Sequence, residues 1–189
     1  MTQIEITTAM SVEDYGEGKI LIEEYAAALG VDLCFQNFAE EMASLSRTYG
    51  PPHGCLLLAR TDGELVGCVA IRRQDAAVCE MKRLYVKPQY RRAGLGRRLT
   101  ESAIGHARQL GYFRMVLDTL PSMTEAQSLY ESLGFREIEG YYQNPLDGVR
   151  YMACELGNDE QTTDNARHRG GGRVCLRLPT WSRESTVVA

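Results

Sequence analysis

The sequence predicts a mixed α/β fold in a single domain. Apolar, β-rich runs at 55–60 and 64–72 flank Thr61-Asp62-Gly63, and Asp-Gly between two such runs is a strong hairpin signal. A third apolar run, 78–86, leads through a glycine-rich turn into a segment with helical periodicity. With 189 residues, 44% of them hydrophobic, the chain is long enough for one substantial core and too short for two.

The N-terminal segment predicts a short strand and two helices. Residues 4–7 alternate like a strand, and Ser11 supplies an N-cap hydroxyl for a helix that runs to about Leu29. A second helix is predicted by apolar residues at helical spacing and ends at Gly50-Pro51-Pro52. Its apolar stripe consists of Phe35, Phe38, Met42 and Leu45.

The second half alternates between helices and strands. The helix after the glycine-rich turn buries one apolar stripe and ends at Gly111. A buried strand is predicted at 114–119. The next helix is predicted to begin at a capping box at 122–125 and to end at Gly134. Residues 135–142 and 149–156 are predicted to be two further strands. The predicted stripe consists of Leu95, Leu99, Ala103, Ala107 and Leu110.

The last 33 residues differ in composition from the rest. Residues 157–189 are polar and contain Gly170-Gly171-Gly172, with a brief apolar patch near Trp181. Such composition is typical of disordered segments. The sequence therefore predicts a folded domain at 1–156 and a disordered tail at 157–189.

Composition argues against several classes of function. The net charge of −4 is unlike that of a protein whose main partner is nucleic acid. The chain shows no secretory leader and no apolar run of membrane-spanning length, so we expect a cytoplasmic protein without a membrane partner. Six cysteines occur without a Cys-x-x-Cys pair or suitably spaced histidines, which predicts buried thiols and no metal site.

The glycine-rich turn carries most of the functional information. Residues 91–96 read Arg-Arg-Ala-Gly-Leu-Gly, and a strand that passes through such a turn into a helix directs several backbone N–H groups toward one place. A nucleoside-triphosphate loop would end in Gly-Lys-Ser or Gly-Lys-Thr, whereas Arg97 follows here. A dinucleotide fold would have a third glycine where this chain has Leu99. The turn therefore predicts a pyrophosphate cradle, with coenzyme A as the remaining ligand.

The turn resembles the signature of the GNAT superfamily of N-acetyltransferases, which is Arg or Gln, two residues, Gly, one residue, then Gly or Ala. Residues 80–86 look like the family's central strand, and 126–135 look like its second signature, Ala-x-x-Leu-Tyr-x-x-x-Gly-Phe. The resemblance covers roughly residues 1–156. It implies a twisted, mostly antiparallel central sheet, splayed at the coenzyme site, with helices on both faces. In the first signature the matching residues are Arg91, Gly94 and Gly96.

The resemblance also implies a binding site for acetyl-CoA, the acyl donor. The backbone of 84–86 would pair with the pantetheine arm, and the Leu84 N–H would polarise the thioester carbonyl. Many family members have an asparagine seven residues before the signature tyrosine, where this chain has Met123. The predicted coenzyme-binding residues are Leu84, Tyr85, Val86, Arg91, Arg92, Ala93, Gly94, Leu95, Gly96, Arg97 and Ala126.

Two residues are candidates for proton transfer. Tyr130 matches the family tyrosine that protonates the departing thiolate. Glu80 stands where many members carry a strand glutamate that takes the amine's proton, but it reads equally well as an exposed acid or an ion-pair partner of Lys82 or Arg83. The first two helices would flank the acceptor entrance, or simply pack in the core. The predicted acceptor-binding residues are Arg83, which would hold a carboxylate, and Tyr141 and Tyr142.

Together these features predict an enzyme that moves an acetyl group from acetyl-CoA to a primary amine by direct attack. A small-molecule acceptor is favoured because the chain shows no added peptide-docking module. The alternatives are acetylation of a protein N-terminus or lysine, and a catalytically idle acyl-CoA-binding module. Retention of Tyr130 favours the enzyme. We expect a monomer or homodimer that requires no metal.

Overall fold

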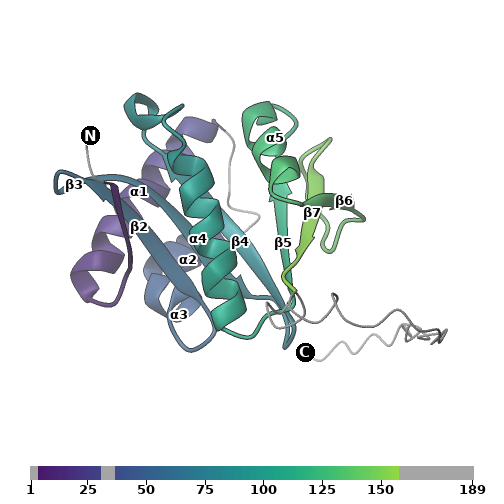
Figure 1. Cartoon of the computed structure of the whole chain (residues 1–189), viewed down its shortest axis with the longest axis horizontal. Coiled ribbons are helices and arrows are strands. Elements are labelled where there is room, and N and C mark those ends of the chain that lie inside the picture. The colour runs from purple at the N-terminus through teal and green to yellow at the C-terminus, as the bar shows by residue number, and fades with distance from the viewer. Residues whose placement is uncertain (1–3, 31–36, 158–189) are drawn as a thin grey trace, which may run out of the picture. The chain divides into compact units, whose positions relative to one another are not determined.

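The computed structural model describes residues 4–30 and 37–157. The chain divides into two units, 1–158 and 159–189, and all of the described helices and strands belong to the first. The predicted tail lies outside the described residues except for Gly157, and so does Phe35. Figure 1 shows the elements, which are β1 (Ile4–Thr8), α1 (Val12–Leu29), α2 (Phe38–Ala43), α3 (Leu45–Tyr49), β2 (Cys55–Thr61), β3 (Glu64–Arg73), β4 (Val78–Val86), η2 (Pro88–Tyr90), α4 (Leu95–Gln109), β5 (Arg114–Thr119), α5 (Thr124–Ser132), β6 (Arg136–Ile138) and β7 (Arg150–Glu155).

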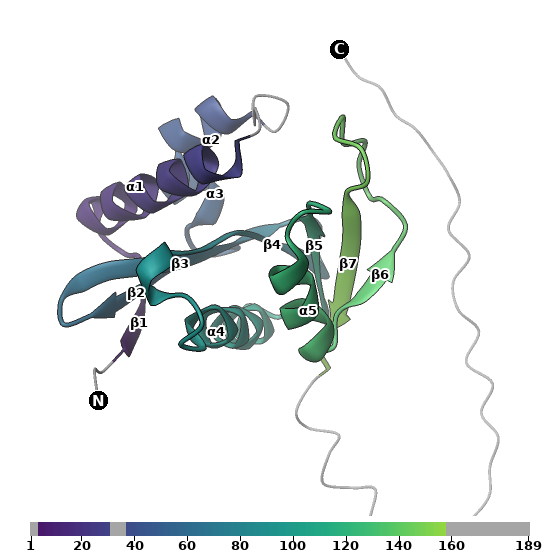
Figure 2. The same ribbon diagram turned by 90° about the horizontal axis from the view of Figure 1, so that it is seen from above.

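The strands form one sheet in the order β1-β2-β3-β4-β5-β7-β6. Every neighbouring pair is antiparallel except β4 and β5, which are parallel. Figure 2 shows α1, α2 and α3 on one face of the sheet and α4 and α5 on the other. The predicted mixed sheet with helices on both faces is therefore confirmed.

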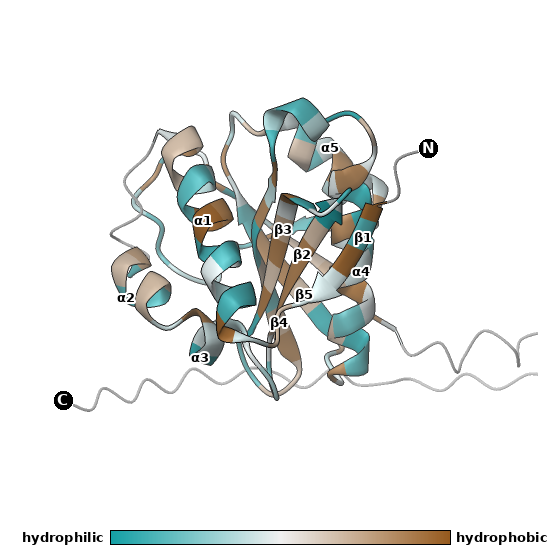
Figure 3. Cartoon of the chain, turned by 90° about the vertical axis from the view of Figure 1, so that its left-hand side faces the viewer, coloured by the Kyte–Doolittle hydropathy of each residue, from teal (hydrophilic) through white to brown (hydrophobic). Residues whose placement is uncertain are grey.

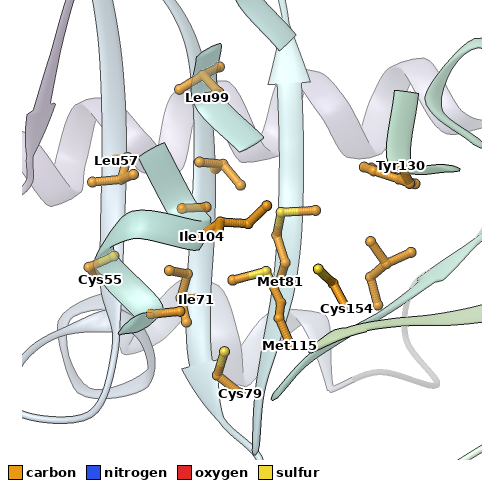
Figure 4. Close-up of a cluster of buried hydrophobic side chains, with 14 of the residues drawn as sticks. Cys55, Leu57, Ile71, Cys79, Met81, Leu99, Ile104, Met115, Tyr130 and Cys154 are labelled. Atoms are coloured by element: carbon orange, nitrogen blue, oxygen red, sulfur yellow. The ribbon is translucent and has the colours of Figure 1, made fainter. Parts of the chain in front are cut away.

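Two hydrophobic cores cover the two faces of the sheet. Successive residues of a strand point to opposite faces, so Leu57 of β2 packs in the core beneath α4, and Leu56 and Leu58 pack beneath α1. This explains why the central strands read as continuous apolar runs, and Figure 3 shows hydrophobic residues concentrated in these strands between the helices. In Figure 4, Leu99 and Ile104 of α4 meet Ile71, Met81 and Met115 of neighbouring strands.

Several local predictions are confirmed. The Ser11 hydroxyl accepts a hydrogen bond from the Asp14 N–H at 3.1 Å, which makes Ser11 the N-cap of α1. Asp62 and Gly63 both adopt left-handed backbone conformations, with φ of 50° and 81°, as a two-residue hairpin requires. The free thiols of Cys55, Cys68, Cys79 and Cys154 are buried.

The predicted second helix is divided in two at Ser44. The Ser44 backbone has φ −144° and ψ 45°, and the Ser44 hydroxyl donates to the Glu40 carbonyl at 2.9 Å. Such local side-chain hydrogen bonds compete with the helical backbone pattern. Consequently α2 and α3 are separate short helices that meet at an angle the apolar periodicity did not reveal.

The predicted capping box at 122–125 is absent. Met123 is the N-cap of α5, and no side-chain hydrogen bond caps this end of the helix. The Met123 N–H instead closes a turn on the Leu120 carbonyl at 3.0 Å, and this turn places Ser122 before the helix. The strand predicted at 135–142 is also shorter than expected, because β6 ends at Ile138. After Ile138 the chain turns, and Tyr141 and Tyr142 pack against Tyr151.

Replacing Gly67 with Ala should lower the free energy of unfolding by roughly 1–3 kcal/mol, the usual range for overpacking. A Cβ built on Gly67 would lie 2.7 Å from the Tyr85 carbonyl oxygen, so the backbone of β4 would have to move. Gly105→Ala in α4 is the matched control, because a Cβ there meets nothing within 4 Å. It should stabilise by up to about 1 kcal/mol. Thermal unfolding of both variants checks this, and equal melting temperatures would contradict it.

Candidate active site

The site begins where β4 and β5 part. Their parallel pairing spans only Val78–Glu80 against Arg114–Val116. Beyond Glu80 the hydrogen-bonding edge of β4 is no longer paired with β5, which is the splay that the family resemblance implied.

A bulge in β4 lies at the same place. On β3 the register advances two residues, from Cys68 to Ala70, while on β4 it advances three, from Lys82 to Tyr85. Arg83 takes up the extra residue in a left-handed conformation, with φ 57°. Bulges re-aim neighbouring side chains and interrupt pairing, and here the bulge directs Lys82, Arg83 and Leu84 into the splay, where all three line a cavity.

Two adjoining spaces occupy the splay. The larger is a groove of about 700 Å³ between the end of β4, the 91–97 turn and the beginning of α5. The smaller is a cavity of about 50 Å³ between β4 and β5, with room for a few water-sized groups. The two spaces adjoin and share four lining residues, which are Tyr25, Leu29, Leu84 and Met123.

Ten of the eleven residues predicted to bind the coenzyme line the groove; only Ala93 does not. Gly94 is the N-cap of α4, with φ 77°, and no side-chain hydrogen bond caps this end of the helix. The N–H groups of that turn and the positive end of the helix dipole therefore face the groove, as an anion-binding site requires.

The arginines of the turn have different partners. The Arg91 Nε donates to the Val86 carbonyl at 3.0 Å and its guanidinium lies over the Tyr85 ring, so this side chain braces the end of β4. Arg97 donates to the Ser132 hydroxyl at 2.7 Å. Arg92 is exposed, and only a 3.8 Å contact joins it to Glu125, so among the three it is the most available for a ligand's charge.

Tyr130 of α5 lines the small cavity, and its ring packs against Phe135 with centroids 5.7 Å apart. Burial, with a smaller contribution from Tyr25 and Asp118, raises the pKa of its phenol above the ordinary value. The side chain is therefore protonated at neutral pH and able to donate. The Thr119 hydroxyl is buried beside the same cavity and has no hydrogen-bond partner in the described part of the chain, so it offers an unused donor to a ligand.

Glu80 is completely buried. Its Oε2 accepts a hydrogen bond from Arg72 Nε at 2.6 Å, its Oε1 accepts one from the Tyr141 hydroxyl at 2.8 Å, and Lys82 Nζ lies 3.6 Å from the same Oε1. Glu80 is therefore not an exposed acid, and it lies within ion-pair distance of Lys82. Glu80 does not line the cavity.

Arg83 lines the cavity but its guanidinium is bound elsewhere. It donates to both carboxylate oxygens of Glu41, at 2.8 and 2.6 Å, and lies over the Phe38 ring. Burial alone would lower the pKa of Arg83, but the hydrogen bonds and charge of Glu41 raise it. The predicted acceptor-carboxylate contact would require this buried pair to open.

The tyrosines predicted to line the acceptor pocket hold the two acids of the site. Tyr141 donates to Glu80. Burial raises the pKa of Tyr142, and the charge of Asp118 and a hydrogen bond to it raise that pKa further. The loop contributes Asn144 and Leu146 to the cavity wall instead.

Sequence reasoning missed Asp118 and Tyr25. Asp118 lies near the end of β5, lines the cavity and is 3.6 Å from Lys82 Nζ. The available signal was a lone acid directly after the apolar run Met115–Leu117. Tyr25 of α1 lines both spaces, and burial raises its pKa to about 12. Nothing in the helical pattern of α1 distinguished Tyr25 from a packing residue.

In the described ranges, no helix is long and apolar enough to cross a bilayer. No group of three or more histidine, cysteine or acidic side chains within those ranges is arranged to hold a metal ion.

Comparison with known proteins agrees with this geometry. The model of the acetyltransferase (GNAT) family matches residues 20–135. An uncharacterized N-acetyltransferase of Schizosaccharomyces pombe is 43% identical over 157 residues, which cover 82% of this chain and 96% of that protein. The human N-acetylaspartate synthetase is 36% identical over 121 residues, 61% of this chain and 39% of that protein.

Solved structures show the same fold. A GNAT family acetyltransferase from Elizabethkingia anophelis with acetyl-CoA bound aligns with a TM-score of 0.54 at 18% identity, over 80% of this chain and 97% of that one. The splayed sheet, the uncapped helix after the glycine turn and the matched sequence lead to one assignment. This chain belongs to the GNAT family of acetyltransferases.

Proposed function

We propose that the protein transfers an acetyl group from acetyl-CoA to the primary amine of a small molecule, by direct attack of the amine on the thioester. The observation that carries the proposal is that the groove at the α4 N-terminus adjoins the small cavity that Tyr130 lines, with four lining residues in common. One space suits an extended, phosphorylated donor, and the other suits only the reacting groups.

The groove fits the donor. Its volume of about 700 Å³ is within the range of about 300–1,000 Å³ usual for ligand sites. The first turn of α4 would hold the pyrophosphate, Leu84–Val86 would hold the pantetheine arm through the backbone, and the buried Thr119 hydroxyl is free for a hydrogen bond near the thioester. Acetyl-CoA bound to a protein of the same fold supports this choice.

The cavity favours a small acceptor. About 50 Å³ admits an amine and the atoms next to it, which leaves little room for a bulky acceptor. The human relative's name identifies it as a synthetase of N-acetylaspartate, which is a small acetylated amine. Peptides with a free N-terminus are the competing class of acceptor.

A screen of amines tests the proposal directly. The full chain is incubated with acetyl-CoA and a panel of small primary amines, amino acids and short peptides, and free CoA is detected as released thiol. We expect turnover with one group of small amines. Turnover with peptides alone would refute the small-molecule acceptor, and no thiol release with any amine would refute the transferase.

Tyr130→Phe should lower turnover by roughly 10²-fold, the usual contribution of a positioned general acid. The variant keeps the ring that packs on Phe135 and removes only the hydroxyl that protonates the leaving thiolate. Acetyl-CoA affinity should change little, and the loss should shrink for an acyl donor with a better leaving group. Steady-state kinetics and calorimetry measure the two quantities.

Tyr112→Phe is the matched control, because its buried hydroxyl donates to the His53 carbonyl and Tyr112 lines neither the groove nor the cavity. It should retain wild-type turnover. Full activity in Tyr130→Phe would reduce Tyr130 to a packing residue and favour the idle acyl-CoA-binding module.

A further inference from the structure

Two carboxylates lie next to the splay, and they differ in access. Asp118 lines the cavity with its side chain 14% exposed, while Glu80 is 0% exposed and lies behind it. Both Glu80 oxygens already accept hydrogen bonds, from Arg72 and Tyr141. A carboxylate that takes a proton from a substrate must lie within hydrogen-bond reach of it, directly or through one water, and of these two carboxylates only Asp118 lines the cavity.

Lys82 connects the two acids. Its ammonium lies 3.6 Å from Glu80 Oε1 and 3.6 Å from Asp118 Oδ1, and its side chain is 5% exposed. Glu80 is held from the other side by Arg72 and Tyr141, so it fixes the position of Lys82. Through Lys82, Glu80 therefore contributes to the position of the Asp118 carboxylate, which Tyr142 also holds by a hydrogen bond.

The other groups around Asp118 are tyrosines from several elements. They are Tyr25 on α1, Tyr130 on α5, Tyr141 and Tyr142 on the loop after β6, and Tyr151 on β7. Burial is the largest cause that raises the pKa of each phenol, and the negative charge of Asp118 adds to it. These phenols therefore stay protonated through the neutral range, and none competes with Asp118 as a base.

We propose that Asp118 is the carboxylate that receives the acceptor's ammonium group and takes its proton, and that Glu80 is a positioning residue acting through Lys82. This inference rests on the proposed acetyl transfer. The ammonium gives one proton to Asp118, which passes it to solvent. The amine nitrogen then bonds to the thioester carbon, the C–S bond breaks with its electron pair on sulfur, and Tyr130 protonates the thiolate. The nitrogen's second proton restores the phenol, so one proton is released in each turnover.

Asp118→Asn and Glu80→Gln, compared across pH 6–10, test the assignment. Asp118→Asn should lower turnover by roughly 10²-fold near neutral pH, with the deficit shrinking as pH rises because the amine then arrives neutral. Glu80→Gln should lower turnover by a smaller factor with the same pH dependence, since it displaces the Asp118 carboxylate without removing it. Asp147→Asn, an exposed acid on the neighbouring loop, is the charge-matched control and should retain wild-type turnover.

Folding and coenzyme binding are checked in the same preparations. Lys82 keeps Glu80 as a partner in Asp118→Asn, so melting temperature and acetyl-CoA affinity should stay near wild type. Because Glu80→Gln alters a buried charge, Tyr141→Phe serves as its second variant and removes only the hydroxyl that holds Glu80. It should reproduce the smaller loss of Glu80→Gln, with the same decline of the deficit at high pH.

Three outcomes would overturn the inference while the proposed function stands: full activity in Asp118→Asn, a loss in it that does not depend on pH, or a pH-dependent loss confined to Glu80→Gln. If the wild-type chain itself releases no CoA with any amine, the proposed function fails, and the role of Asp118 fails with it.

Discussion

Glu41→Gln should lower the free energy of unfolding by about 3–5 kcal/mol, because removing one partner of a buried ion pair leaves the other charge uncompensated. The side chains of Glu41 and Arg83 are 4% and 3% exposed and are joined by two hydrogen bonds, and Tyr49 adds a third to Glu41 at 2.6 Å. In the variant, the Arg83 cation would remain buried beside a neutral amide. Urea unfolding of both proteins measures the difference.

Glu40→Gln is the matched control. Glu40 precedes Glu41 in α2, but its side chain is 70% exposed and only a 3.5 Å contact joins it to Arg47. An exposed pair of this kind contributes little, so this variant should unfold almost like the wild type. Equal losses in the two variants would show that the helix, and not the buried pair, governs the effect.

The same pair predicts a pH dependence. Burial alone would raise the pKa of Glu41, but the hydrogen bonds and charge of Arg83 outweigh burial and lower it below the ordinary value of 4.5. A depressed folded-state pKa contributes stability that is present above pH 4.5 and is lost as pH falls through the folded value. The melting temperature of the wild type should therefore fall more steeply below pH 4.5 than that of Glu41→Gln.

Gly96→Glu should weaken acetyl-CoA binding by about 100-fold or more, because like charges brought together at an interface cost several kcal/mol. Gly96 lies in the first turn of α4 and lines the groove, so the new carboxylate would occupy the place of the pyrophosphate. The fold should persist, since a Cβ at this position meets only the Leu129 side chain at 3.6 Å and an acidic residue suits a helix N-terminus.

Calorimetry with acetyl-CoA measures the affinity, and Gly105→Glu is the control. It adds the same charge to the same helix, where a Cβ meets nothing within 4 Å and the residue does not line the groove. It should bind acetyl-CoA like the wild type. Unchanged affinity in folded Gly96→Glu would refute the assignment of the α4 N-terminus as the phosphate site.

The coenzyme side of the site was predictable from the sequence because its chemistry is local. A strand, a glycine turn and a helix are contiguous in the chain, and their N–H groups converge whatever the rest of the fold does. Gly94 through Arg97 therefore line the groove as expected. Tyr130 was predicted in the same way, because the signature that contains it lies within a single helix and the turn that follows it.

The acceptor side was not predictable, because its contacts join distant segments. Arg83 was expected to bind a substrate carboxylate, and Glu41, 42 residues away, takes that role within the protein. Glu80 was expected to act on the amine, but Tyr141, 61 residues away, and Arg72 hold it in the interior. A local sequence pattern contains no information about partners that are so distant along the chain.

The sequence by itself determined the elements that depend on neighbouring residues in the chain: the hairpin at Asp62-Gly63, the cap at Ser11, the apolar strands and the glycine turn that leads into α4. Only the tertiary structure decided which carboxylate faces the acceptor. That choice results from where the pairing of β4 with β5 stops and from the bulge at Arg83. Both features depend on pairing between strands that are distant in the sequence. Whether a charged residue is buried or faces the cavity is therefore decided by its neighbours in the folded sheet.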